Sequence, residues 1–203
     1  MNRLIFATGN AGKMREIRRI MEDTGLEILS MKEAGISAGA EENGSTYEEN
    51  ALIKARAVAA ACAGELVLTD DSGLEIDSLN GEPGVYSARY MGEDTPYSVK
   101  NASLIKRLEG VPEEKRGARF VCAIAAVLPD GRELTTRACI EGRIGYREAG
   151  GGGFGYDPIF YVPELGKTTA ELTEEEKNEV SHRGKALRLM KEELKKYEAA
   201  DCE

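Results

Sequence analysis

Short apolar runs alternate with a helical pattern over the first thirty residues, and this order constrains the fold more than any other feature. Residues 4–7 (LIFA) are a short apolar run, and residues 26–30 (LEILS) are another. Between them lie apolar residues with the spacing of one helix face: Met14, Ile17, Ile20 and Met21. The pattern stops at Gly25, a common helix end. The order predicts a strand–loop–helix–strand unit, which is typical of α/β sheets.

The alternation continues and then changes along the chain. Residues 45–64 are expected to form a helix opened by a capping box of Ser45 and Glu48, and residues 66–69 a buried strand. A third helix is predicted after Thr95, with Pro96 at its first position. Two strands then flank the turn 129–132, and a helical pattern closes the chain. We predict one domain over residues 1–203, a mixed α/β sheet with flanking helices, in two lobes with a substrate cleft between them.

The turn Pro129–Arg132 also predicts a strand register. If Asp130 and Gly131 form a two-residue hairpin loop, Cys122 lies opposite Cys139. In a reducing cytoplasm we expect these two residues to pack as thiols rather than form a disulfide.

Charge and hydropathy exclude several classes of protein. The net charge of −9 opposes general attraction to nucleic acid or to an anionic membrane. No apolar run approaches the roughly 18 residues of a membrane span. We therefore expect a cytoplasmic protein that binds neither nucleic acid nor membrane, and any anionic ligand must be held by local cations or by a metal.

The loop TGNAGK, Thr8 to Lys13, lies between the first predicted strand and the first helix. It is not a P-loop, because only two residues separate its glycines and Met14 follows the lysine. A helix N-terminus with a nearby lysine is nevertheless a favourable phosphate site. An ordinary strand-to-helix turn with a solvated lysine explains the loop equally well.

Adjacent acids follow the predicted strand 66–69. Asp70 and Asp71 would lie at its carboxyl end, where α/β proteins commonly bind ligands, and carboxylates suit Mg²⁺. Alone, these residues are better explained by an Asx turn; beside a phosphate loop on a neighbouring strand, metal binding is the better interpretation. Glu41 or Glu42 is a further candidate ligand, although acid pairs on loops are usually solvated.

Two later motifs carry ring and cationic side chains. In the glycine-rich segment 150–158, Phe154 and Tyr156 are candidates to stack on a planar base and Asp157 to accept hydrogen bonds from it, although the aromatics fit a core role equally well. His182 and Arg183 are predicted in the first turn of the last helix, where cations oppose the helix dipole. That placement points weakly to a bound anion; a surface His–Arg pair is the simpler alternative.

Taken together, these motifs in this order resemble the inosine triphosphate pyrophosphatase family: TGNAGK, DDSGL, PGVYSARY, GFGYDP, AELTEEEKN and SHR. The resemblance implies a homodimeric, Mg²⁺-dependent enzyme that hydrolyses deaminated purine nucleoside triphosphates (ITP, dITP, XTP) to the monophosphate and pyrophosphate. It implies that Asp71 is the catalytic carboxylate and a metal ligand, with Glu42 favoured over Glu41 as the second ligand. It further implies a substrate-binding set: Thr8, Gly9, Asn10, Ala11, Gly12, Lys13, Ser72, Phe154, Gly155, Tyr156, Asp157, Lys177, His182 and Arg183.

The chemistry of these residues is compatible with that reaction. Cleavage between the α- and β-phosphates needs charge neutralisation and an activated water, which Lys13, a metal and Asp71 can supply. His182 and Arg183 are candidate donors to the 6-oxo group that distinguishes these purines from adenine. Two alternatives remain at this stage: a Mg²⁺-dependent hydrolase of modified pyrimidine nucleotides, and a nucleotide sensor without catalysis.

Overall fold

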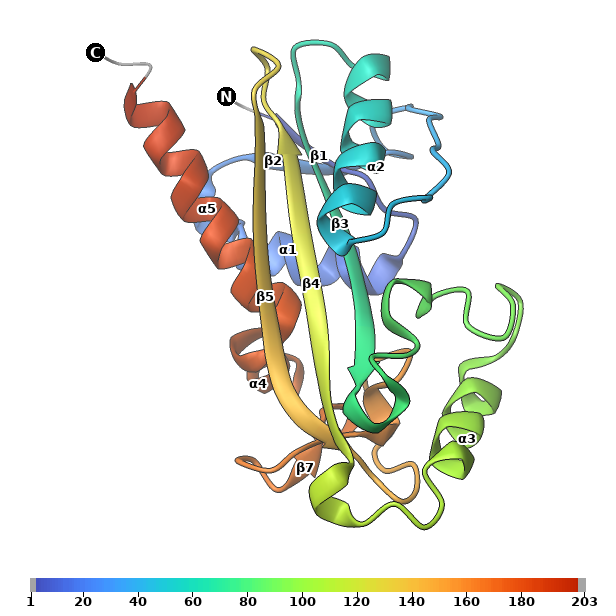
Figure 1. The fold of residues 1–203 in the computed structure, drawn as a ribbon. Coiled ribbons are helices and arrows are strands. Elements are labelled where there is room, and N and C mark those ends of the chain that lie inside the picture. The colour runs from blue at the N-terminus through green and yellow to red at the C-terminus, as the bar shows by residue number, and fades with distance from the viewer. Residues whose placement is uncertain (1–2, 201–203) are drawn as a thin grey trace. The chain divides into compact units, whose positions relative to one another are not determined.

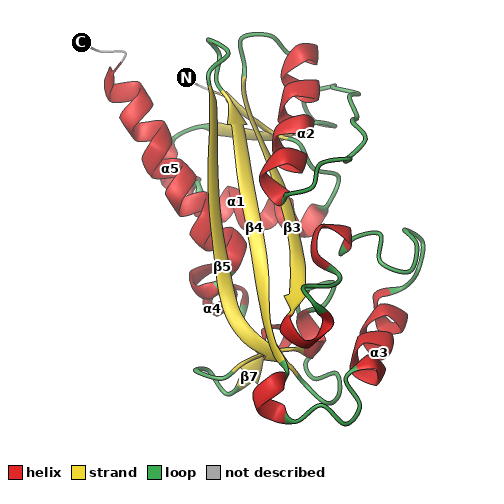
Figure 2. Ribbon diagram, viewed as in Figure 1, coloured by secondary structure: helices red, strands yellow, loops and turns green. Residues whose placement is uncertain are grey.

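The computed structural model describes the backbone of residues 3–200 and the side chains of residues 3–197. It contains one sheet with the strand order β2-β1-β3-β4-β5-β6-β7 (Figures 1 and 2). The strands are β1 Arg3–Phe6, β2 Glu27–Ser30, β3 Leu66–Ile76, β4 Gly117–Val127, β5 Glu133–Ile144, β6 Phe160–Val162 and β7 Lys167–Thr168. The α-helices are α1 Ala11–Ile20, α2 Tyr47–Ala61, α3 Tyr97–Arg107, α4 Glu174–Val180 and α5 His182–Ala200. Single 3₁₀ turns cover Glu22–Thr24, Asp77–Leu79, Gly84–Tyr86, Glu113–Lys115, Asp157–Ile159 and Thr169–Glu171.

Strand direction changes across the sheet. β1 pairs in parallel with both β2 and β3, whereas β6 is antiparallel to β5 and to β7. The predicted mixed sheet with flanking helices is therefore confirmed. The chain divides into two compact units: unit 1 runs up to Asp71 and adds Cys122–Ala138 and the chain from Arg183, while unit 2 holds Ser72–Val121 and Cys139–His182. No described helix is both long enough and apolar enough to cross a membrane.

Unit 1 has helices on both faces of its strands. Along β1, Leu4 and Phe6 join the core formed with α1 and α5, whereas Ile5 joins the core formed with α2. Figure 1 shows α1 and α5 on one side of these strands and α2 on the other. Because successive strand residues point to opposite faces, an apolar run without alternation is what a sheet covered on both sides requires.

Unit 2 has a separate apolar core, to which α3 and the strand segments of this unit contribute. A buried arginine fixes the ends of two of its elements, α3 and β5. The Arg116 guanidinium is 1% exposed and donates to the backbone carbonyls of Leu108, Ile144 and Gly145. These three bonds satisfy carbonyls at or next to the ends of α3 and β5.

The acid pair lies inside a strand, whereas the sequence predicted that the strand ends at residue 69, before the acids. β3 continues through Asp70 and Asp71 to Ile76. Its neighbour β1 ends at Phe6, which pairs with Leu68, so the acids lie where β3 extends beyond β1. A run of small and acidic residues favours a turn locally, but here the acids are buried against cations, and tertiary contacts override the local preference.

Three predicted helix and turn details were also wrong by about one residue. Thr46, not Ser45, caps α2, and Pro96, not Thr95, caps α3. The hairpin has a three-residue loop, because the Leu128 N–H donates to the Arg132 carbonyl and Gly131 adopts a positive φ of 87°. This register places Ala138, not Cys139, opposite Cys122. Cys122 is buried, and burial raises its pKa to about 12, whereas Cys139 is exposed.

Candidate active site

The segment Thr8–Lys13 follows β1 as predicted, but only its first three residues form a loop, because α1 already begins at Ala11. The segment's own side chains organise it. The Asn10 carboxamide caps α1, accepting from the N–H groups of Gly12 at 2.8 Å and Lys13 at 3.2 Å. The Thr8 hydroxyl accepts in turn from the Asn10 N–H. Two of the amides expected to face a phosphate therefore bind Asn10 in this structure. The sequence favoured this cap, since Asn is among the best N-cap residues.

Asp70 is the centre of a buried ion cluster in unit 1. Its Oδ2 atom lies 2.8 Å from the Lys13 ammonium and 3.2 Å from Nε of Arg183. Arg183 also pairs with Glu16, and its side chain is 2% exposed. Burial acts to raise the pKa of Asp70, but Lys13, Arg183 and Lys54 outweigh it, so the net pKa lies below its usual value. Asp70 is therefore held as a carboxylate that fixes two cations.

Asp71, the next residue, lies in a different electrostatic environment. It accepts a hydrogen bond from Nδ2 of Asn50 at 3.2 Å, and the Lys54 ammonium is 3.8 Å from its Oδ1. Burial raises its pKa, and the charges of Glu42 and Asp70 raise it further against the opposing effects of Lys54 and Asn50. A carboxyl with a raised pKa is a stronger base than an ordinary aspartate, and such groups are common at catalytic sites.

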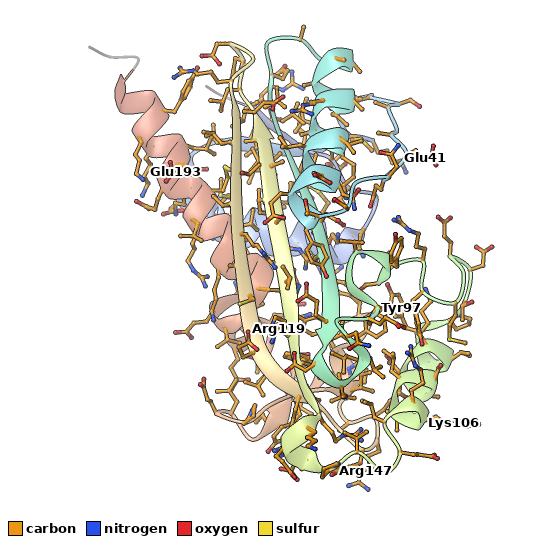
Figure 3. The ribbon with its side chains drawn as sticks, in the orientation of Figure 1. Glu41, Tyr97, Lys106, Arg119, Arg147 and Glu193 are labelled. Atoms are coloured by element: carbon orange, nitrogen blue, oxygen red, sulfur yellow. The ribbon has the colours of Figure 1, made fainter. Side chains whose placement is uncertain are left out.

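Lys54 connects this carboxylate to Glu42. Its ammonium lies 3.2 Å from Oε1 of Glu42 and donates to the Asp70 carbonyl at 2.7 Å. Asn50 bonds the N–H of Gly44, on the loop that carries Glu42, as well as Asp71. By contrast, Glu41 is exposed on that loop before α2 (Figure 3). Within the described residues, no three side chains of His, Cys, Asp or Glu are arranged to hold a metal.

A second cluster lies within unit 2 and contains three of the predicted substrate residues. The Asp157 carboxylate accepts from the Lys177 ammonium and the Phe154 N–H, both at 2.7 Å, and from the Thr169 hydroxyl at 2.8 Å. The Lys177 ammonium also lies 4.7 Å from the centroid of the Phe154 ring. Lys177 is on α4, and the 37% exposed Phe154 presents part of its surface to solvent.

His182 and Arg183 occupy the first turn of α5 as predicted, but they contact different groups. The His182 ring stacks on Phe120 in unit 2 with 4.9 Å between centroids, whereas Arg183 binds Asp70 and Glu16 in unit 1. Ser72 lies on β3 directly after Asp71. The boundary between the units thus passes through two of the sequence motifs, DDSGL and SHR.

The residues in contact around Asp70 and Asp71 are here called the unit 1 cluster: Lys13, Glu16, Glu42, Asn50, Lys54, Asp70, Asp71 and Arg183. The sequence analysis missed three of them. Asn50 and Lys54 lie on α2, and Glu16 lies on α1. Asn50 and Lys54 are four residues apart and therefore share one helix face, which was a usable signal. Glu16 gave none, because an acid in a predicted helix is usually solvated.

The fold and this site define a class of α/β protein. In this class a helix N-terminus suited to an anion lies beside two buried acids whose charges are offset by lysine and arginine. The chain belongs to the Ham1 family, whose model matches residues 4–193. A dITP/XTP pyrophosphatase of Geobacter sulfurreducens is 50% identical over 194 residues, covering 96% of this chain and 97% of that protein.

Solved structures give the same result. The Ham1 protein of Staphylococcus aureus aligns with a TM-score of 0.86 and 39% identity, covering 97% of this chain and 100% of the other. A nucleoside-triphosphatase / dITP/XTP pyrophosphatase of Mycobacterium abscessus aligns with a TM-score of 0.73 and 41% identity, covering 93% and 98%. The family resemblance inferred from the sequence motifs is therefore confirmed.

Proposed function

We propose that this chain hydrolyses deaminated purine nucleoside triphosphates (ITP, dITP and XTP) between the α- and β-phosphates, releasing a nucleoside monophosphate and pyrophosphate. One observation carries the proposal: two adjacent buried carboxyls contact different groups beside a helix N-terminus that bears a lysine. Asp70 binds the cations Lys13 and Arg183, whereas Asp71 binds Asn50 and lies near Lys54. The names of the similar proteins identify the substrate class.

The unit 1 cluster is proposed to bind the triphosphate. Lys13 and Lys54 supply full positive charges, and the N-terminus of α1 adds the positive end of the helix dipole. The Thr8 and Asn10 side chains add polar groups beside them. This arrangement favours a group with several negative charges over a monophosphate, because each additional phosphate adds charge within reach of these cations.

Asp71 is proposed to act as the general base. Its carboxylate takes a proton from water as the water oxygen attacks the α-phosphorus, and the bond from that phosphorus to the bridging oxygen breaks. The electron pair of that bond leaves with pyrophosphate, and the added hydroxyl oxygen remains on the monophosphate. Asn50 holds the carboxylate in place, and Lys54 lowers the cost of its negative charge.

Mg²⁺ is the proposed cofactor, held by Glu42 and Asp71. The donor set fits this ion, because both ligands are carboxylate oxygens near one ammonium. Burial and then the charge of Glu42 raise the pKa of Asp71, and a divalent cation would offset both effects. Mg²⁺ usually takes only one or two carboxylates and completes its shell with waters and phosphates. When bound, it neutralises phosphate charge that develops during the reaction.

The unit 2 cluster is proposed to bind the base and sugar. The partly exposed Phe154 offers a ring for stacking, and Lys177 and His182 offer donors to the purine oxygens. The Asp157 carboxylate already accepts three hydrogen bonds, so we assign it to holding Phe154 and Lys177 in place rather than to contacting the base. Arg183 binds Asp70 and so supports the unit 1 cluster, which is proposed to bind the phosphates.

A cytoplasmic location, a homodimer and a single functional domain belong to the same proposal. The family model matches residues 4–193, a range that includes residues of both units. Sedimentation at several protein concentrations tests the dimer directly.

Pyrophosphate release from ITP, XTP, GTP and ATP, with and without Mg²⁺, tests the reaction. We expect Mg²⁺-dependent release from ITP and XTP and little from ATP. Release of orthophosphate, equal rates for all bases, or preference for pyrimidine analogues would overturn the proposal. Binding of ITP without any turnover would favour the sensor.

Replacing Lys13 with alanine should weaken binding of a non-hydrolysable ITP analogue by about 10- to 100-fold, the value of a lost charge-assisted bond. Binding of IMP should change by less than about twofold, because the ammonium is assigned to the outer phosphates. Calorimetry on both ligands measures the difference. Arg15→Ala, an exposed cation on the same helix, is the matched control. Equal losses for both ligands would contradict the assignment.

A further inference from the structure

Tyr156 lies in the motif GFGYDP but its side chain is not presented to solvent. It is 4% exposed, and it packs in the apolar core of unit 2. Its hydroxyl donates to the Ser87 carbonyl at 2.8 Å. Phe154, two residues earlier, is 37% exposed. The two aromatic residues of this motif therefore differ in their surroundings: Tyr156 is buried and hydrogen-bonded, whereas Phe154 is partly exposed to solvent.

Ser87 connects this anchor to β3. The Ser87 hydroxyl accepts from the Leu74 N–H at 2.8 Å and donates to the Gly84 carbonyl at 2.6 Å. Leu74 is the second residue after Ser72 on the strand. The backbone of the motif PGVYSARY is thus bonded on one side to the strand that follows the acid pair, and on the other to Tyr156.

The carbonyl of the next residue, Ala88, also accepts from a buried side chain. Lys100, on α3, is fully buried, and its ammonium donates to the Ala88 carbonyl at 2.6 Å. Burial lowers its pKa, as expected where a charge is removed from water. A buried lysine is costly, and a role in fixing a specific carbonyl accounts for its presence at this position.

Tyr97 closes the ring of contacts. Figure 3 shows it on α3, and its ring meets that of Tyr156 edge-to-face at 5.2 Å between centroids. The Lys100 ammonium lies 4.9 Å from the centroid of the Tyr97 ring. The contacts thus run from Ser87 to Tyr156, Tyr97, Lys100 and Ala88, which is bonded covalently to Ser87. We call these five residues the clamp.

A further bond joins the same helix to the base-binding loop. Nδ2 of Asn101 donates to the carbonyl of Gly155, between Phe154 and Tyr156, at 3.3 Å and to Glu148 at 2.7 Å. Gly155 adopts a positive φ of 70°, and an added Cβ would lie 3.5 Å from the Tyr97 ring. Glycine therefore permits the turn that buries Tyr156 while leaving Phe154 exposed.

We propose that Tyr156 is a positioning residue, not a substrate contact, and that through the clamp it holds Phe154 where the purine base stacks. This inference rests on the proposed function, since it assumes that Phe154 meets the base. It predicts a specific split: loss of the clamp weakens binding of the base, while phosphate binding and the chemical step remain intact. A residue in contact with the phosphates or a merely structural residue would not produce this split.

The decisive variant is Tyr156→Phe, which removes one oxygen and keeps the ring in the core. The Ser87 carbonyl then loses its buried donor, so the loop gains freedom. We expect the KM for ITP and the Kd for IMP to rise about 10-fold and kcat to change by less than about twofold. The inhibition constant of inorganic tripolyphosphate, which has no base, should stay unchanged.

A second variant and a matched control accompany it. Lys100→Met removes the other donor and should shift the same two constants in the same direction. Tyr86→Phe changes a 59% exposed tyrosine next to Ser87 and should leave every constant unchanged. In the double variant of Tyr156 and Lys100, the effects should be less than additive, because both act on one loop.

The outcomes separate this inference from the function on which it rests. If the unaltered chain releases no pyrophosphate from ITP, the proposed function fails, and IMP calorimetry on the variants still decides the clamp. If the unaltered chain is active but Tyr156→Phe binds IMP normally, only the clamp is overturned. A parallel rise in the tripolyphosphate constant would also overturn it, because the effect would then be general.

Discussion

Replacement of Asp71 by asparagine should lower kcat for pyrophosphate release by about 10³-fold, within the range that general-base catalysis contributes. Asparagine keeps the size of the side chain and can still accept from Asn50, but it cannot take a proton from water. The loss should appear in kcat and in kcat/KM together, because the group acts in the transition state.

The same variant should not be less stable than the unaltered protein. The pKa of Asp71 is raised on folding, so between the ordinary aspartate pKa and the raised value the folded state binds more protons than the unfolded state. Stability therefore falls as pH rises through that window, and the ionised group destabilises the fold at neutral pH. Asparagine does not ionise, so the penalty disappears in the metal-free protein.

Steady-state kinetics in Mg²⁺ measure the loss of turnover, and urea unfolding in chelator measures the stability of the metal-free protein. Glu41→Gln, which neutralises an exposed acid nearby, is the control and should alter neither. Near-normal turnover by Asp71→Asn would remove Asp71 from its assigned role. A large loss of stability would mean that the lost activity reports unfolding instead of chemistry.

The predictable part of this protein follows from local pattern. Apolar spacing predicted the strand–loop–helix–strand order at the N-terminus and the last helix, which begins at His182. This spacing is predictive because it reflects packing against a sheet. The family was identified from six motifs whose joint order is far more specific than any one of them.

The missed parts depend on contacts between distant residues. Asp70 and Asp71 look alike in sequence, and burial acts to raise the pKa of both. At Asp70 the cations Lys13 and Arg183 outweigh burial, whereas at Asp71 the charge of Glu42 adds to it. Likewise, nothing local distinguishes the buried Tyr156 from the exposed Phe154. The continuous β3 was missed for the same reason, since its polar centre is stabilised by residues far away in the chain.

Replacing Asp70, in contrast to Asp71, should principally cost stability. Removing the carboxylate takes this acid away from the Lys13 ammonium and from the 2% exposed Arg183, in a region shielded from water. Breaking a buried ion pair by removing one partner typically costs about 3–5 kcal/mol, and we expect Asp70→Asn to lose that much free energy of unfolding. Comparison of Asp70→Asn with Asp71→Asn is well matched, because adjacent residues undergo the same chemical change.

The pH dependence provides the independent check on Asp70. Its pKa is lowered on folding, so its contribution to stability is present above the ordinary aspartate pKa and is lost as pH falls through the lower, folded value. Urea unfolding from neutral to acid pH should therefore show the difference between Asp70→Asn and the unaltered protein shrinking as the solution becomes acidic. A constant difference, or equal stability of the two aspartate variants at neutral pH, would show that the ion cluster does not stabilise the fold. If the cluster does, the lowered pKa of Asp70 is the electrostatic counterpart of the raised pKa of Asp71: the first carboxylate fixes the cations, and its charge helps to keep the second basic.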